Sequence, residues 1–123
     1  MMLYDPHGTG AAPEDLLVRR GSSWESARRL ADQAARAQQG GTAINGVPYG
    51  HGVSVTSPPA NQHLARDPDD ASSATRQAFE DEGFQVRHTP TRKDSDHHTV
   101  QLPEPVTDEV ATRFNTILGR TRK

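Results

Sequence analysis

The stretch His51-Gly52-Val53-Ser54-Val55-Thr56-Ser57 decides both the fold and the place to look for a site. Successive side chains of a strand point to opposite faces, so its two valines share one face and Ser54 and Thr56 share the other. The glycines Gly50 and Gly52 permit close approach of another backbone or of a ligand. This pattern fits a ligand-binding strand at the lip of a cleft, and it also fits an ordinary half-exposed edge strand that carries hydroxyl groups.

Composition limits the classes of function that need to be considered. The chain has 123 residues, which suits a single domain over residues 1–123 with a modest core. Its net charge of -2 gives no global attraction to nucleic acid or to an anionic membrane. The absence of cysteine excludes disulfides, thiolate catalysis and cysteine zinc sites. We find no apolar run long enough to span a membrane and no signal peptide, and we therefore expect a soluble chain with no membrane partner.

The N-terminal half reads as short elements before one longer helix. Residues 2–4 predict a first strand, and residues 13–18 predict a helical turn with proline and acids in its first turn. Ser22-Ser23-Trp24-Glu25 has the pattern of a capping box, which predicts a helix to about Gln38. The apolar stripe of that helix is mostly alanine, so we expect Trp24 to be its main anchor.

The C-terminal half predicts a helix, a hairpin and a last helix. A helix capped by Ser72 or Ser73 extends through Glu82 with Phe79 inward. Alternating residues at 84–88 and 97–102 predict two strands of a hairpin. Thr107 caps a final helix whose apolar face holds Val110, Phe114, Ile117 and Leu118. The fold class is therefore α+β: a single domain with a mixed or mainly antiparallel sheet and flanking helices.

Histidines and hydroxyls are the main candidates for chemistry. His97 and His98 are neighbours on a strand and point to opposite faces, so they do not share one metal ion, and we expect no metal site. Ser54, His97 and Asp96 would make a Ser-His-Asp triad, although no nucleophile-elbow glycine motif accompanies them.

Three stretches resemble one family. They are Leu3-Tyr4 on a first strand, Gly52-Val53-Ser54-Val55 in mid-chain, and His97-His98-Thr99-Val100 running into a proline-rich stop and a final helix. Together they resemble the ADP-ribosyltransferase-like bacterial toxins, especially the small cytoplasmic toxins delivered by type VI secretion, in which a His-Tyr-Thr strand precedes prolines and a helix. Ser54 matches the mid-chain serine of that family, and His98 stands where the family has tyrosine.

The resemblance implies an ADP-ribosyltransferase-like fold and an NAD-dependent mono-ADP-ribosyltransferase toxin. A secretion system delivers such a toxin into a target cell, where it acts in the cytoplasm. The toxin pairs with a cognate immunity or antitoxin protein. The implied catalytic residues are Ser54, His97 and Glu104, and the implied NAD-binding residues are Tyr4, Ser54, Thr56 and His98. The chain departs from the family at the catalytic acid, because the last strand ends in Gln101 and Glu104 follows only after Pro103.

Two other classes remain open. A metal-independent ribonuclease toxin would use His97 or His98 with His51 or His88 as general acid and base, because histidines titrate near neutral pH. The basic side chains that would bind its phosphate are Arg87, Arg92 and Lys93. A non-catalytic interaction protein would use all these residues only for structure.

Overall fold

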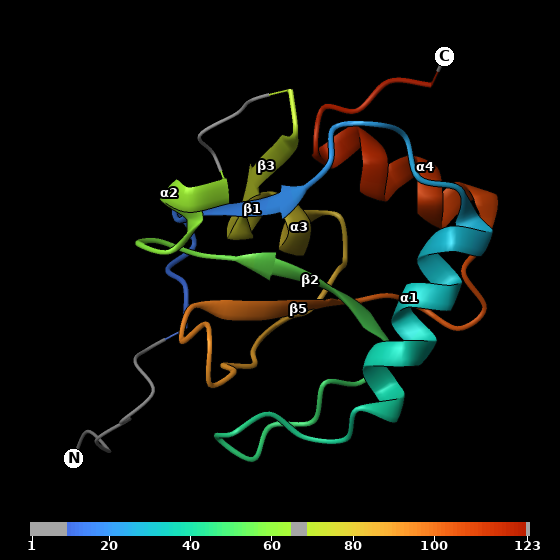
Figure 1. Ribbon diagram of the computed structural model, residues 1–123. Coiled ribbons are helices and arrows are strands. Elements are labelled where there is room, and N and C mark those ends of the chain that lie inside the picture. Colours follow the sequence, from blue (N-terminus) through green and yellow to red (C-terminus); the bar gives the residue numbers. More distant parts are fainter. Residues whose placement is uncertain (1–9, 65–68, 123) are drawn as a thin grey trace.

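The computed structural model describes residues 10–64 and 69–122. In chain order the elements of these residues are β1 (Leu16–Arg20), α1 (Ala27–Gln39), β2 (Gly52–Thr56), α2 (Asn61–Leu64), β3 (Ala71–Thr75), α3 (Arg76–Asp81), β4 (Val86–His88), β5 (His97–Gln101) and α4 (Asp108–Ile117) (Figure 1). The predicted strand at residues 2–4 lies outside the described residues.

The strands form one five-stranded sheet in the order β3-β1-β2-β5-β4. Each neighbouring pair is antiparallel. The predicted α+β class with a mainly antiparallel sheet is therefore confirmed, and so is the hairpin of β4 and β5. β2 and β5 are central neighbours in the sheet, although 40 residues of chain separate their nearest ends.

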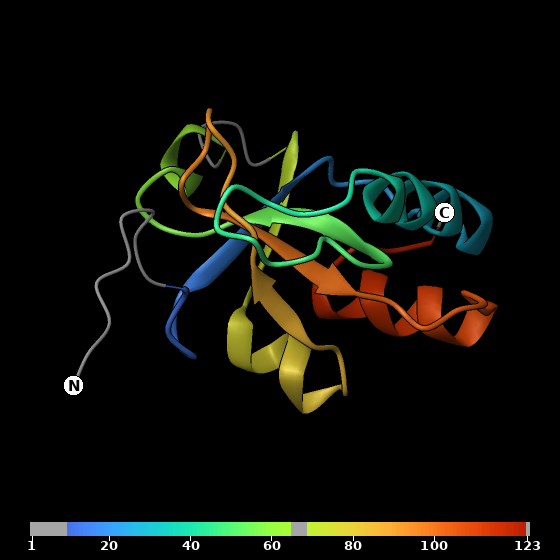
Figure 2. The ribbon, with the colours of Figure 1, turned by 90° about the horizontal axis from the view of Figure 1, so that it is seen from below.

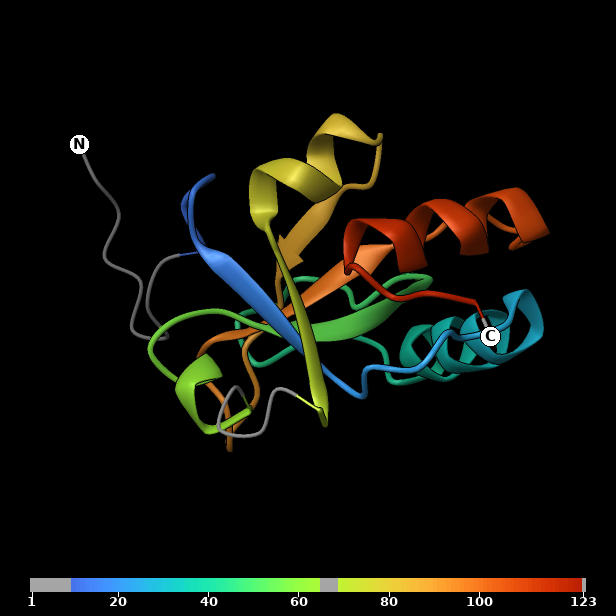
Figure 3. The ribbon, with the colours of Figure 1, turned by 90° about the horizontal axis from the view of Figure 1, so that it is seen from above.

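Helices lie on both sides of the sheet. Figures 2 and 3 show α3 and α4 on one side and α2 on the other, with α1 beside α4. The core lies between the sheet and α1, α3 and α4. Its largest fully buried apolar side chains are Phe79, Phe114, Leu17, Leu30, Val53, Val55 and Val100. The opposite sheet face, which α2 only partly covers, is left for polar side chains.

Strand β2 has the predicted alternation. Val53 and Val55 are buried against the core, and Ser54 is exposed on the other face. The glycine before them serves the sheet itself: a Cβ at Gly52 would lie 2.3 Å from the carbonyl oxygen of Val100 on β5. The close approach permitted by Gly52 is therefore that of a neighbouring backbone.

Two predictions for the N-terminal half are wrong. A helical turn was expected at residues 13–18, but residues 16–20 form a strand, because they pair with β3 along their whole length and bury Leu17. Helix α1 is capped at Ser26, whose side chain accepts a hydrogen bond from the Arg29 amide. The expected capping box at residues 22–25 does not form, since the Glu25 carboxylate is held by two arginines instead.

The region before Phe79 also differs from the expectation. Residues 71–75 form the edge strand β3, and α3 begins only at Arg76, with Thr75 as its cap. Trp24 is half-buried, whereas Leu30 and Ala34 of α1 are fully buried. Leu30, the larger of these two side chains, therefore anchors the helix rather than Trp24. Phe79 is fully buried as predicted.

The final helix confirms its prediction. Thr107 caps α4 by accepting a hydrogen bond from the Val110 amide, 3.2 Å away. Phe114 is fully buried and Leu118 is 5% exposed, while Ile117 packs partly buried at the margin of the core.

Candidate functional site

The pairing of β2 with β5 brings Ser54 and His97 together. Thr56 pairs with His97 and Ser54 with Thr99, so all four residues lie on the sheet face away from the core. His97 Nε2 lies 2.9 Å from Ser54 Oγ. The structure thus brings together Ser54 and His97, two of the implied catalytic residues. Tyr4, one of the implied NAD-binding residues, lies outside the described residues.

A backbone carbonyl fixes the ring of His97. Its Nδ1 lies 2.8 Å from the carbonyl oxygen of Thr89 and 2.9 Å from the Thr89 hydroxyl. Because a carbonyl oxygen only accepts, Nδ1 carries the proton in the neutral ring and Nε2 is the acceptor. The Ser54 hydroxyl therefore donates to His97 Nε2. The imidazole also makes an edge-on contact with the ring of Tyr49, with 6.1 Å between the ring centroids, and this contact further restricts it.

The surroundings keep His97 uncharged near neutral pH. Burial lowers the pKa of His97, and the hydrogen bond to the Thr89 backbone and the charge of Asp94 only partly oppose this effect. The charge of His88 lowers the pKa further. Nε2 of the neutral imidazole accepts a hydrogen bond from the Ser54 hydroxyl. The same lone pair can take a proton from a bound hydroxyl or amine that replaces the Ser54 hydroxyl there.

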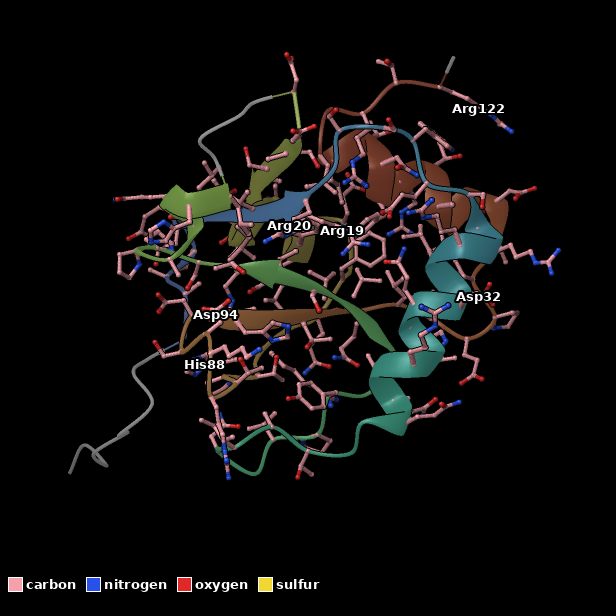
Figure 4. The ribbon with its side chains drawn as sticks, viewed as in Figure 1. Arg19, Arg20, Asp32, His88, Asp94 and Arg122 are labelled. Carbon is pink, nitrogen blue, oxygen red and sulfur yellow. The ribbon has the colours of Figure 1, made fainter. Side chains whose placement is uncertain are left out.

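Ser54 and His97 open into a cleft of about 480 Å³. Its walls come from β1, β2, α2 and the loop before β5, through Val18, Arg19, Arg20, Ser54, Val55, Thr56, Ala60, His63, Leu64, Lys93, Asp94 and His97. In Figure 4, Arg20 on β1 and Asp94 in that loop lie on opposite sides of β2. The volume lies within the range of roughly 300–1,000 Å³ typical of small-molecule sites.

Charged groups of both signs line this cleft. Arg20 and Lys93 supply two cations, and among the described residues no acidic side chain forms an ion pair with either of them. Asp94 supplies a carboxylate, and its Oδ2 accepts a hydrogen bond of 3.0 Å from the Thr56 hydroxyl. The cleft can therefore bind an anion such as a phosphate through its cations, and hydroxyl groups through its carboxylate.

A buried ionic network supports the back of the site. Arg19 donates through Nη1 to the carbonyl oxygen of Ser54 at 2.9 Å, and it pairs with Glu25 at 3.1 Å. Arg120 joins the same carboxylate at 2.7 Å and also donates to the carbonyl oxygen of Arg20. Burial raises the pKa of Glu25, but the charge and hydrogen bonds of Arg19, Gln33 and Arg120 outweigh burial and hold that pKa below its usual value.

Two expected site residues lie elsewhere. His98 is fully buried on the core face, where its Nε2 accepts a hydrogen bond from the Ala11 amide at 2.9 Å. Glu104 is exposed beyond the Gln101 end of β5, whereas His97 is at the other end, about 13 Å away at roughly 3.3 Å per residue. The structure therefore keeps Ser54, Thr56 and His97 together in the cleft and brings neither His98 nor Glu104 to it.

Three contributors were missed by sequence reasoning. Arg20 follows the helical turn that was expected at residues 13–18, and residues 16–20 show no apolar–polar alternation that would signal the strand carrying Arg20 to the cleft. No role was predicted for Asp94. Thr89 acts on His97 mainly through its backbone carbonyl, which no residue type in a sequence can indicate.

Comparison of the chain with protein-family models, with curated proteins and with solved structures found no match. In the part of the chain that the structure describes, no helix has the length and apolar character needed to cross a membrane. Over the same residues, no group of three or more His, Asp or Glu side chains is arranged to hold a metal ion.

Proposed function

We propose that this chain is an NAD-dependent ADP-ribosyltransferase-type bacterial toxin and that the cleft at β2 and β5 is its NAD site. The observation that carries the proposal is the hydrogen bond between Ser54 and His97 inside a cleft that also presents Arg20 and Lys93. Ser54 and His97 are the two residues that the resemblance to the toxin family marks as the mid-chain serine and the strand histidine. Delivery by a secretion system, action in the target cytoplasm and a cognate immunity protein belong to the same proposal.

The residues present fit the chemical groups of NAD. Arg20 and Lys93, which both line the cleft, suit a pyrophosphate, because cations bind phosphate oxygens through charge-assisted hydrogen bonds. The hydroxyls of Ser54 and Thr56 suit the ribose. When bound, NAD supplies an ADP-ribosyl group through cleavage of its bond to nicotinamide.

His97 is the group placed to move a proton. Its Nδ1–H donates to the Thr89 carbonyl oxygen, so the ring keeps Nε2 directed at Ser54 and the cleft. An acceptor that attacks the ribose loses a proton, and the neutral Nε2 can receive it. Ser54 holds this nitrogen in line until substrate binds, which makes the serine a positioning and ribose-binding residue.

Alanine and glutamine variants test the proposal. We expect NAD to raise the melting temperature of the purified chain, because a ligand that binds only the native state stabilises it by about 2.7 kcal/mol at 100-fold its Kd. We expect His97→Gln to lower nicotinamide release about 100-fold and Ser54→Ala to lower it roughly 10-fold. Expression in a bacterial cytoplasm should slow growth, and both variants should relieve that toxicity.

The matched control is Ser73→Ala, which removes an exposed serine hydroxyl from β3, outside the cleft. It should remain toxic and active. A harmless wild-type chain with no melting shift in NAD would contradict the proposal and favour the interaction protein.

A second function has one specific observation in its favour. His63 of α2 lines the same cleft as His97, together with Arg20 and Lys93. Two histidines and two cations can serve as acid, base and phosphate ligands of a metal-independent ribonuclease. The partners expected for His97 from the sequence, His51 and His88, do not line this cleft. RNA cleavage in EDTA without NAD, lost in both His63→Gln and His97→Gln, would favour this function.

A further inference from the structure

The loop before β5 holds a carboxylate in a defined place within the cleft. Asp94 lies in a tight turn in which its amide donates to the Thr91 hydroxyl at 3.0 Å. Its Oδ1 accepts from the Asp96 amide at 2.9 Å, and its Oδ2 accepts from the Thr56 hydroxyl at 3.0 Å. These contacts fix both the backbone and the carboxylate plane beside β2.

The carboxylate keeps capacity for a substrate. An ionised carboxylate has about four acceptor positions, and the contacts with Asp96 and Thr56 occupy two of them. Because Asp94 lines the cleft, the remaining positions can accept hydroxyl groups of a ligand. The hydrogen bond from Thr56 holds Asp94 Oδ2 in place and leaves the carboxylate able to accept further hydrogen bonds.

The charge of Asp94 acts where positive charge would develop. Asp94 and His97 line the same cleft, and the negative charge of Asp94 partly opposes the lowering of the His97 pKa by burial. A sugar that loses a leaving group beside Ser54 and His97 becomes cation-like, and a fixed negative charge nearby stabilises that state. Glu104 cannot do this from the far end of β5.

We propose that Asp94, and not Glu104, is the catalytic carboxylate of this cleft, accepting a hydrogen bond from a ribose hydroxyl and stabilising the positive charge on the ribose. This inference rests on the proposed function. In the reaction the bond between ribose C1′ and the nicotinamide nitrogen breaks, and its electron pair goes to the nicotinamide ring. A hydroxyl, amine or water acceptor brings the electron pair of the new bond to C1′, and its proton goes to His97 Nε2.

Asp94→Asn tests the inference because the two side chains have the same shape. The amide oxygen can still accept from Asp96, and the Thr56 hydroxyl can reverse to accept from the amide nitrogen, so we expect the fold to remain. We expect kcat for nicotinamide release to fall about 100-fold and KM for NAD to change less than about 3-fold, because the lost interaction forms mainly in the transition state. The pKa of His97, followed by NMR, should fall when the negative charge is removed.

Two further variants separate the outcomes. Glu109→Gln on α4 is the matched control and should leave kcat unchanged, and Glu104→Gln tests the rival carboxylate. If Asp94→Asn keeps the wild-type kcat, or if Glu104→Gln loses it, the role of Asp94 is refuted while the transferase stands. If the wild-type chain releases no nicotinamide, the proposed function fails and the role of Asp94 fails with it. An unchanged pKa of His97 in Asp94→Asn would also refute the electrostatic argument.

Discussion

The buried imidazole of His98 should make this protein lose stability as the pH falls from 7 to 4. The pKa of His98 is lowered from 6.5 to about 4, mainly by burial. The charges of His88, Arg76 and His97 also lower this pKa, and the hydrogen bond to the Asp96 backbone opposes the shift. The ring is fully buried, and its unprotonated Nε2 accepts from the Ala11 amide. Protonation would place a second donor against that amide and a charge in the core.

The magnitude follows from the two pKa values. Between pH 6.5 and 4 the unfolded chain binds a proton at His98 that the native chain does not, so the free energy of unfolding rises with pH across this window. A difference of about 2.5 pH units at about 1.36 kcal/mol per unit gives roughly 3 kcal/mol. This contribution is fully present above pH 6.5 and is lost as the pH falls to about 4.

Urea unfolding between pH 4 and 7.5, followed by the fluorescence of the single tryptophan, measures this loss. The matched variant is His98→Gln, whose Oε1 can accept from the Ala11 amide but does not titrate. The wild type should be the more stable protein at pH 7, and its advantage over the variant should shrink by about 3 kcal/mol by pH 4. His97 and the acidic residues titrate in both proteins, so they cancel in the difference.

The reasoning is refuted if the difference in unfolding free energy between wild type and His98→Gln is the same at pH 4 and at pH 7. An NMR titration that gave the native His98 a pKa near 6.5 would refute it independently. Either result would mean that the imidazole accommodates its proton in the native state.

Two further predictions concern the core and the ionic network. Phe114→Ala should lower the free energy of unfolding by about 3 to 5 kcal/mol, because Phe114 is fully buried; urea melts would show it, and a loss under 1 kcal/mol would contradict the core assignment. Arg120→Met should destabilise by about 3 kcal/mol by leaving the Glu25 carboxylate short of a partner. In a double-mutant cycle with Glu25→Gln, the double variant should lose clearly less than the sum of the single losses, and strict additivity would count against the pair.

Elements with strong local patterns could be predicted from the sequence. β2 and β5 alternate clearly, and α4 has a threonine cap and an apolar stripe, so local structure and packing agree there. The strands at residues 16–20 and 71–75 could not be predicted in the same way. Ala71–Thr75 is rich in serine and alanine and resembles a helix start, and it is a strand because β1 offers it a ladder from Leu16 to Arg20.

The capping error has the same physical origin. Ser22 and Glu25 have the spacing of a capping box, but a box requires a free carboxylate. Arg120, which is 95 residues further along the chain, binds that carboxylate together with Arg19. A strong contact between residues distant in sequence therefore outweighs a local pattern worth about 1 kcal/mol.

The site was predictable to the extent that it depends on strand alternation. Ser54 and His97 were both implied as catalytic residues, and adjacent strands of one sheet place them within hydrogen-bonding distance. Glu104 was an implied site residue because it is the acid nearest to the end of β5, but the structure leaves it outside the cleft and holds Asp94 beside β2 through a hydrogen bond from Thr56. Loop geometry of this kind depends on contacts that no periodic pattern records.

The adjacent histidines show how the sheet register assigns chemistry to a sequence. A shift of β5 by one residue would exchange His97 and His98, because a one-residue slip moves each side chain to the opposite face. The observed register buries Val100 beside Val53 in the core and fits the backbone of β5 against Gly52. It thereby gives one histidine a titratable position in an open cleft and gives the other a buried structural role. The packing of the apolar strand face therefore decides which of the two histidines lines the cleft and which is buried in the core.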